Sequence, residues 1–389
     1  MCAWVAESDA LARPGAVLKR SLGRARRLQL YPLDLSILRV FPDEVTVKLR
    51  LLVLLTVLAS SLVGLRSSFA RSQVPAKSFP VTVIDDHGNH VRLSARPQRL
   101  LSLDPRDTET LFALGLESRV VGDGSQYSEG AAGIKRNFRY PSEWPSRLGR
   151  DYPIQAKALP HVEGGYSGTP FNLETISSLR PDLILAPYSK TEEPTYQKLH
   201  ELGITVIILD PSSIHGILSD LALVGKATGA VKQAAVVSKT IKKQVSGVKK
   251  SLARIHSRPR VYYEIDAANP TQPFTAGPGT FIDEALRLAG GKNVADSVTS
   301  CSDTLCYPQF SLEALVQLNP QIILLGDAAY GTTVDSVKAR GGWSTIAAVQ
   351  SGKIFPFNDE LVSRAGPRIG IGLKALARVV HPEAFGKKR

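Results

Sequence analysis

The chain has 389 residues, of which 43% are hydrophobic and 21% charged. That is enough apolar material for one large or two medium globular units, and it excludes a disordered or fibrous protein. The net charge is +13, but residues 1–70 already hold 10 Lys and Arg against 5 Asp and Glu. The remaining excess is spread out without an aromatic-interleaved basic patch, which argues against a nucleic-acid partner.

The N-terminal region predicts export. The apolar run at residues 51–65 follows Lys48 and Arg50 and precedes Ser68-Phe69-Ala70, which indicates a signal peptide over residues 47–70. A retained membrane anchor is the alternative, although the run is shorter than the roughly 20 residues that span a bilayer. Residues 1–46 are then an untranslated or disordered extension, with translation starting near Val47. No Cys follows the run, so no lipid anchor of the usual bacterial kind is predicted.

Two cysteines lie close together near the C-terminal third of the chain. Cys301 and Cys306 share a predicted loop, and outside the cytosol we expect them to form a local disulfide. The spacing lacks further Cys or nearby His, so it makes a poor zinc site, and no metal site is predicted.

The first lobe begins with alternation typical of strands. Residues 81–84 and 91–93 flank a polar turn and predict a hairpin at one edge of the lobe. A strand at 99–103, a helix at 108–114 and a strand at 120–122 follow. The irregular segment 127–169 is too long for an ordinary connection, so we expect it to carry specificity. Residues 182–186 and 205–209 are continuous apolar strands, as a buried parallel sheet requires.

Residues 230–256 form a proline-free amphipathic pattern that predicts one helix of roughly 40 Å. It separates two stretches that each alternate strands with helices. Beyond it we expect a strand at 260–265, a helix capped by Thr280 and Asp283, strands at 321–325 and 353–357, and a helix at 369–379. The predicted fold is α/β, with two Rossmann-like lobes (79–229 and 259–385) joined by a single long α-helix (230–256).

A short pattern occurs once in each predicted lobe. Asn172-Leu173-Glu174 precedes Pro181 and a strand, and Ser311-Leu312-Glu313 precedes Pro320 and a strand at the same offsets, so the lobes read as related halves. A carboxylate in the first turn of a helix is favoured by the helix dipole, which alone could explain Glu174 and Glu313. Their symmetric placement also suits a two-fold symmetric partner with basic sockets.

Several motifs together resemble one family. They are Arg99-Leu100-Leu101-Ser102-Leu103 with Glu109, Asn172-Leu173-Glu174, Arg180-Pro181-Asp182-Leu183-Ile184, residues 276–284, Gly290-Gly291, residues 307–313 and residues 364–369. The likeness covers residues 79–381. It is to the substrate-binding proteins of iron-siderophore, haem and vitamin B12 ABC importers, a class III periplasmic binding protein fold, and it is nearest to the cobalamin-binding members.

The resemblance implies roles for particular residues. It implies that Glu174 and Glu313 dock on arginines of a dimeric permease. It also implies that aromatic residues and polar groups of the last loop hold a corrinoid between the lobes: Tyr127, Tyr166, Tyr188, Tyr307, Asp359, Glu360 and Arg364. The tryptophans of the vitamin B12 members are absent here, and segment 127–169 is longer than in the shortest of them.

Parts of the sequence also fit other ligands. A ferric siderophore or haem is the alternative ligand, and an anionic siderophore would call on Arg136, Arg139, Arg147 and Arg150. Bare metal-ion capture is a distant alternative, because two of the seven histidines fall in the hairpin and two near the long helix, away from the predicted cleft. No nucleophile elbow, zinc-protease motif or phosphate loop is present, so no enzyme and no cofactor are predicted. We expect a monomer.

Overall fold

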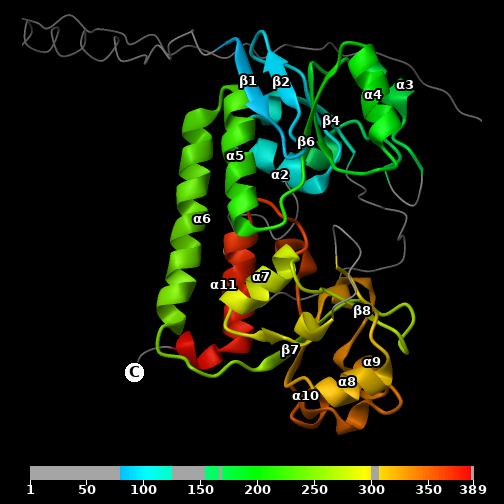
Figure 1. Ribbon diagram of the computed structural model, residues 1–389, viewed down its shortest axis with the longest axis vertical. Coiled ribbons are helices and arrows are strands. Elements are labelled where there is room, and N and C mark those ends of the chain that lie inside the picture. Colours follow the sequence, from blue (N-terminus) through cyan, green and yellow to red (C-terminus); the bar gives the residue numbers. More distant parts are fainter. Residues whose placement is uncertain (1–78, 125–153, 166–168, 299–305, 387–389) are drawn as a thin grey trace, which may run out of the picture. The chain divides into compact units, whose positions relative to one another are not determined.

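The computed structural model describes residues 79–124, 154–165, 169–298 and 306–386 (Figure 1). They belong to one structural unit, 75–389. The predicted signal peptide, the N-terminal extension and most of the long segment 127–169 lie outside the described residues. Among the residues that are described, none of the helices is long and apolar enough to span a bilayer.

The first lobe is built on a four-stranded parallel sheet. Its strands run in the order β4 (Val120–Asp123), β3 (Leu100–Ser102), β5 (Leu183–Pro187) and β6 (Thr205–Leu209). Strand residues such as Leu100, Ile184 and Ile207 are fully buried, which explains their continuous apolar runs. Helices α2 (Pro105–Ala113), α3 (Leu173–Leu179), α4 (Glu193–Glu201) and α5 (Ile214–Thr228) complete the lobe.

The second lobe repeats this arrangement. Parallel strands β9 (Lys292–Asn293), β7 (Arg260–Asp266), β10 (Ile322–Leu325) and β11 (Ile354–Pro356) have the same order as the first sheet. The antiparallel strand β8 (Phe274–Thr275) is added at β7. The helices are α7 (Phe281–Leu288), α8 (Leu312–Leu318), α9 (Val334–Lys338), α10 (Ala347–Gln350) and α11 (Ile369–Val380).

An arginine pair strengthens the internal repeat. Arg99, before β3, donates from Nε to the carbonyl oxygens of Leu179 and Arg180 at the end of α3. Arg260, at the start of β7, donates from Nε to the equivalent carbonyls at the end of α8, those of Leu318 and Asn319. Both arginines satisfy carbonyls that a helix end leaves without partners. The two lobes therefore share topology and local contacts, and the predicted fold class is confirmed.

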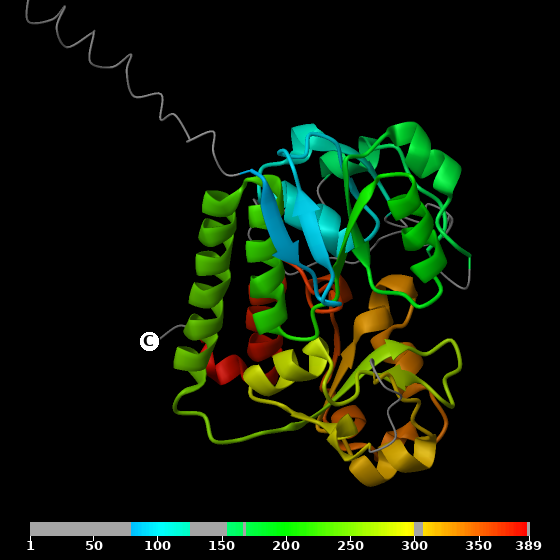
Figure 2. The same ribbon diagram turned by 45° about the horizontal axis from the view of Figure 1, so that its top comes forward.

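Helix α6 (Val231–Leu252) joins the lobes and is slightly shorter than predicted. It ends at Leu252, the last buried residue of its inner face. Its inner face buries Ala234, Ile241, Val248 and Leu252, and it runs alongside α5 and then α11 (Figures 1 and 2). Burial of each of the larger side chains stabilises the contact by about 1.5–3 kcal/mol.

A glycine allows the closest part of this packing. A Cβ atom on Gly370 would lie 2.9 Å from the Cβ atom of Gln244 on α6, so α11 can approach α6 only without a side chain there. Gly370 thus has a packing role, consistent with the absence of a dinucleotide-binding pattern around it.

The hairpin β1 (Val81–Ile84) and β2 (His90–Leu93) lies beside β6, as predicted. The backbone N–H of Asp86 donates to Ile208 O, and the Asp85 carboxylate accepts from the backbone N–H of Ile208.

Two helix starts differ from the prediction. Helix α2 begins at Pro105 instead of Thr108, because the Asp104 side chain accepts a hydrogen bond from Arg106 N and Pro105 suits the first turn. Thr280 caps α7 as expected, but the Asp283 carboxylate does not complete a capping box. It accepts from Gly279 N and Asn293 Nδ2 instead.

Because of Asp220 on α5, we expect the free energy of unfolding to depend on pH. Burial and a hydrogen bond with Asp86 raise the pKa of Asp220 to about 8. The folded chain therefore binds more protons than the unfolded chain between about pH 4 and pH 8, so stability falls as pH rises through this window. Asp220→Asn should weaken this slope and raise stability at pH 8, on the order of 1 kcal/mol or more. Urea unfolding at pH 5 and pH 8 measures it. The exposed-site control Asp335→Asn should keep the wild-type slope, and an unchanged slope in Asp220→Asn would contradict the assignment.

Candidate functional site

The carboxyl ends of the two sheets face one another. Residues directly after β3 meet residues that follow β11: a Cβ atom on Gly366 would lie 3.6 Å from the Cβ atom of Arg106. In each sheet the next parallel strand in the chain adds on one side of the first strand, β3 or β7, and the later strands add on its other side. Ligands of open α/β sheets bind outside the carboxyl ends of the strands at such a point. The candidate site is therefore the space between these two edges.

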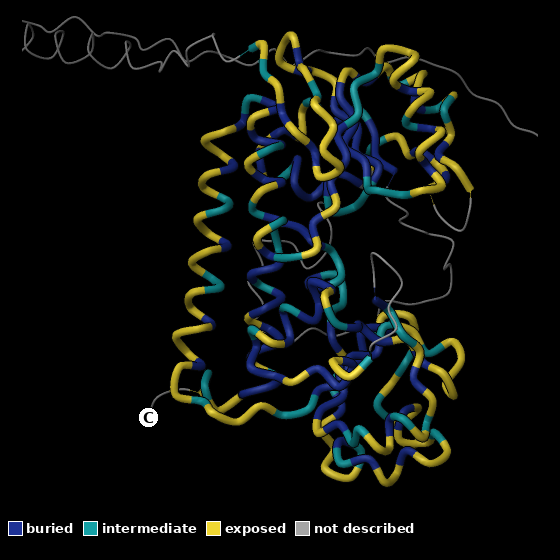
Figure 3. The backbone as a smooth tube through the Cα atoms, in the orientation of Figure 1, coloured by how far each residue is buried: buried dark blue, intermediate teal, exposed yellow. Residues whose placement is uncertain are grey.

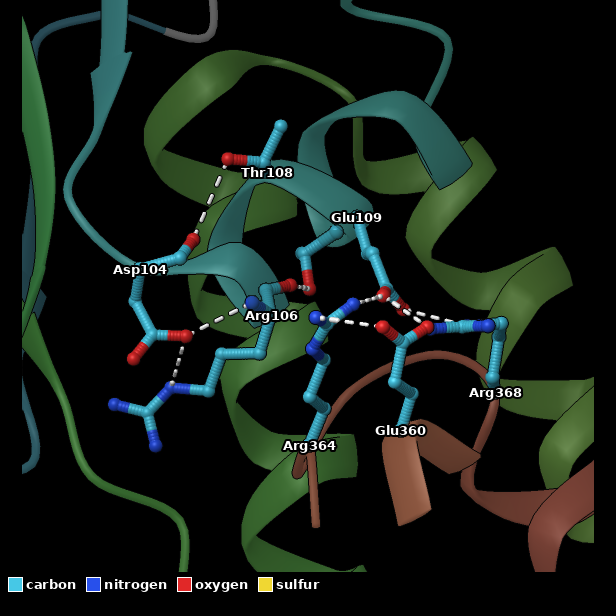
Figure 4. Close-up of polar contacts among 8 residues, drawn as sticks. Asp104, Arg106, Thr108, Glu109, Glu360, Arg364 and Arg368 are labelled. Atoms are coloured by element: carbon cyan, nitrogen blue, oxygen red, sulfur yellow. Dashed lines mark hydrogen bonds and ion pairs between the residues drawn. The ribbon is translucent and has the colours of Figure 1, made fainter. Parts of the chain in front are cut away.

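A buried ion cluster links the lobes at this edge (Figure 4). Glu109 of α2, only 5% exposed, accepts from Arg368 Nε at 2.8 Å and from Arg364 Nη1 at 3.1 Å. Arg364 also donates from Nη2 to Glu360 Oε1 at 3.2 Å. Glu109 of the first lobe and Glu360 of the second together balance the charges of the two arginines.

A second glutamate makes the reciprocal contact. Glu284 of α7 accepts a hydrogen bond from the backbone N–H of Ile214, the first residue of α5, at 2.7 Å. A carboxylate at a helix N-terminus satisfies an otherwise unpaired donor and is favoured by the dipole. Arg368, the partner of Glu109, is likewise the residue before α11. Each lobe therefore sends a glutamate from its first helix to the start of the last helix of the other lobe.

Asp359 and Tyr307 lie together in the second lobe. The Asp359 carboxylate accepts from Tyr263 Oη at 2.6 Å, and burial raises its pKa. Burial, with a smaller contribution from the Asp359 charge, raises the pKa of the half-buried Tyr307 to about 12. Tyr307 is therefore a phenol at physiological pH and offers both an aromatic face and a hydrogen-bond donor.

Tyr188 marks the edge of the first lobe. It follows β5, its hydroxyl donates to Glu193 Oε1 at 3.3 Å, and its ring stacks on His87 with centroids 3.8 Å apart. The expectation that the hairpin histidines lie away from the cleft is wrong for His87, because the hairpin turn bonds to β6 and extends to the strand ends. Within the described residues, however, no three His, Cys, Asp or Glu side chains are grouped to hold a metal ion.

Three predicted site residues lie outside the described residues: Tyr127, Tyr166 and Cys301. Cys306 is buried and disulfide-bonded, and its pairing with Cys301 stays a prediction. A Cβ atom on Gly277 would lie 2.7 Å from Cys306 O, which accepts the Gly277 N–H. This glycine is required for close approach to the cysteine and not for a phosphate.

Glu174 and Glu313 occupy equivalent, exposed positions. Each is the second residue of a seven-residue helix whose preceding residue, Asn172 or Ser311, caps it with its side chain. Hydrogen bonds from the backbone N–H of Glu313 and from Ser311 lower the pKa of Glu313, so it is ionised at neutral pH.

The sequence alone did not assign roles to Glu109 and Arg368. Both fall in the motifs that carry the family resemblance, and the sequence offered one further signal, two arginines four residues apart. That signal does not identify the partner of the arginines, which lies more than 250 positions away in the sequence. A separate pocket of about 520 Å³ near Arg258, Lys353 and His381 lies at the opposite edge of the second sheet, and none of the predicted ligand residues lines it.

Comparison with known families agrees with this geometry. Residues 100–361 match the family model described as periplasmic binding protein, which is well over half of the chain. The chain belongs to the periplasmic binding protein family. This is a family of binding proteins for transport, and the range spans both sheets and α6.

Individual relatives of this periplasmic binding protein are similar over most of their length. It is 28% identical over 319 residues to the uncharacterized ABC transporter substrate-binding lipoprotein YvrC of Bacillus subtilis, covering 81% of this chain and 90% of the relative. It is 29% identical to the cobalamin-binding protein of Halobacterium salinarum, covering 79% and 75%. A solved structure of a possible iron-binding periplasmic solute-binding protein from Staphylococcus epidermidis superimposes with a TM-score of 0.57 at 25% identity, covering 74% and 99%.

Removal of the Glu109 charge should destabilise the protein. Glu109→Gln leaves the half-buried Arg364 and Arg368 short of a counter-charge, so the free energy of unfolding should fall by about 3 kcal/mol. Urea denaturation measures this. The control Glu117→Gln, at an exposed site four residues beyond α2, should change stability by less than about 0.5 kcal/mol. Equal midpoints for Glu109→Gln and wild type would show that the cluster does not stabilise the lobes.

Proposed function

We propose that the protein is the exported substrate-binding component of an ABC importer and that it captures a corrinoid between its lobes. The observation that carries the corrinoid assignment is the similarity to the cobalamin-binding protein of Halobacterium salinarum across 79% of the chain. The sequence features of residues 47–70 support export, to the periplasm or the outer face of the cytoplasmic membrane. We assign the protein no catalytic activity.

The site residues fit an amide-rimmed, flat macrocycle. Tyr188 and Tyr307, with Tyr127 and Tyr166, supply aromatic faces, and Asp359, Glu360 and Arg364 supply polar groups for orientation. Glu360 and Arg364 are already bonded to each other. Binding to the corrin amides therefore exchanges this contact for contacts with the ligand, while Glu109 holds Arg364 in position.

A ferric chelate or haem is the alternative ligand. It is supported by the similarity to the S. epidermidis structure named as possibly iron-binding. In that case Arg136, Arg139, Arg147 and Arg150 of the long segment would contribute, and all four lie outside the described residues. Capture of a bare metal ion is a more distant alternative.

Glu174 and Glu313 are proposed to dock on the permease dimer. Two exposed glutamates at equivalent points of two related lobes match a partner with two-fold related basic sockets. Docking then needs no residue of the ligand site, so a substitution can stop uptake without changing the affinity for the ligand.

Ligand titration tests the corrinoid assignment. Purified protein should bind cyanocobalamin, and not haem or ferric hydroxamates, when followed by calorimetry and visible absorbance. Tyr307→Ala removes an aromatic face and should weaken corrinoid affinity about tenfold, since stacking contributes roughly 0.5–1.5 kcal/mol beyond area burial. Phe355→Ala, which removes a half-buried aromatic ring at the opposite edge of the second sheet, serves as the control. Exclusive binding of a ferric chelate would replace the corrinoid assignment while leaving the importer role intact.

Uptake by cells tests the docking role. The double variant Glu174→Ala, Glu313→Ala should abolish ligand uptake while the purified protein keeps its ligand affinity. Each single variant should retain part of the uptake. The exposed pair Glu117→Ala, Glu201→Ala provides the charge-matched control, and loss of ligand affinity in the docking variant would contradict the separation.

A further inference from the structure

The outer helices of the molecule carry exposed positive charge without exposed negative charge. Between Asp220 and Glu264 the sequence has 10 Lys and Arg and no Asp or Glu. Asp220 itself, the single acid on α5, is buried, and α6 and α11 have none. Six exposed lysines lie on α6, so this helix alone accounts for nearly half of the net charge of +13.

Four of these lysines form a line. Lys232, Lys239, Lys243 and Lys250, which we term the lysine stripe, are spaced by seven, four and seven residues. At 3.6 residues per turn these spacings keep them on one face, and they span about 27 Å. That face is opposite the one that buries Ala234, Ile241 and Val248, and the outer side of α6 is exposed along its length (Figure 3).

The stability of the helix does not explain this line of lysines. Lys239 and Lys243 are like charges four residues apart, which destabilises a helix by about 0.2–0.5 kcal/mol, whereas a glutamate in such a pair would stabilise it by a similar amount. None of the four stripe lysines forms an ion pair with a residue that the structure describes. A helix surface selected only for solubility would mix both signs.

The residues between the lysines indicate the kind of partner. On the outer face they are small or β-branched, Ala235, Val236, Ser246 and Gly247. The face has no aromatic or leucine side chain to insert into a bilayer and none to stack on nucleic-acid bases. A straight line of cations one helix wide matches a linear polyanion better than a plane.

We propose that the lysine stripe of α6 binds a linear, phosphate-bearing polymer of the cell envelope. This inference goes beyond transport and needs only the exported location from the proposed function. The stripe lies on the face of α6 turned away from α5 and α11, so polymer binding leaves the facing sheet edges, Glu174 and Glu313 accessible. Such binding concentrates the protein in the envelope while it exchanges ligand.

Binding to long-chain inorganic polyphosphate tests the proposal. Purified protein should bind it at 50 mM NaCl, and the affinity should fall roughly 50-fold by 200 mM, as release of counterions from about four contacts requires. The stripe variant changes Lys232, Lys239, Lys243 and Lys250 to Gln and should lose this binding. The control changes four exposed lysines elsewhere to Gln, with the same loss of charge, and should retain it: Lys190, Lys292, Lys338 and Lys353.

Single substitutions test the proposal even if the fourfold stripe variant does not fold. Each single Lys→Gln in the stripe should reduce the slope of log affinity against log salt by about 0.7. Three results would overturn the proposal: no binding of the wild type at 50 mM NaCl, equal losses in the stripe and control variants, or equally tight stripe-dependent binding to phosphatidylglycerol vesicles or duplex DNA. None of these readouts involves the transported ligand, so failure here is distinguishable from failure of the corrinoid assignment.

Discussion

The contact on which the two-lobe arrangement depends is the buried carboxylate of Glu109. A charge that is 5% exposed must be neutralised, and its partners, Arg364 and Arg368, belong to the other lobe. Glu284 makes the counterpart contact in the opposite direction, at the start of α5. The two related halves thus contact each other through equivalent helices. A duplicated α/β unit can therefore form a stable pair by making the same kind of contact in both directions.

Helix α6 adds a continuous apolar contact to this pair. One core cluster contains Leu221 of α5, Ile241 of α6 and Leu373 of α11, so the apolar core runs from one lobe into the other. Since packed cores resist continuous deformation, large bending between the lobes is unfavourable. Side chains at the facing sheet edges, which include Tyr188 and Tyr307, therefore keep nearly fixed positions relative to one another.

The described charges are unevenly distributed. Acids such as Asp104, Asp123 and Asp359 and arginines such as Arg106 and Arg364 gather at the carboxyl ends of the strands, whereas the outer helices are basic. Burial raises the pKa of Asp327 to about 6, and it also raises the pKa of Asp359. Both carboxyl groups lie after strands of the second sheet, so burial at this edge makes their ionisation less favourable.

The sequence by itself determined nine of the eleven described strands, the long helix, the repeat and the family, because apolar periodicity, helix caps and recurring spacing are local signals. It missed the two-residue strands β8 and β9, which are too short to show a period. Through resemblance it also predicted ligand roles for Tyr307, Asp359 and Arg364. It did not determine that Arg364 pairs with Glu109, that Arg99 and Arg260 bond to helix ends, or that His87 stacks on Tyr188. Those contacts join residues about 60 to 260 positions apart, and only the tertiary structure decides them, since a side chain's partner depends on which segments the packed sheets bring together.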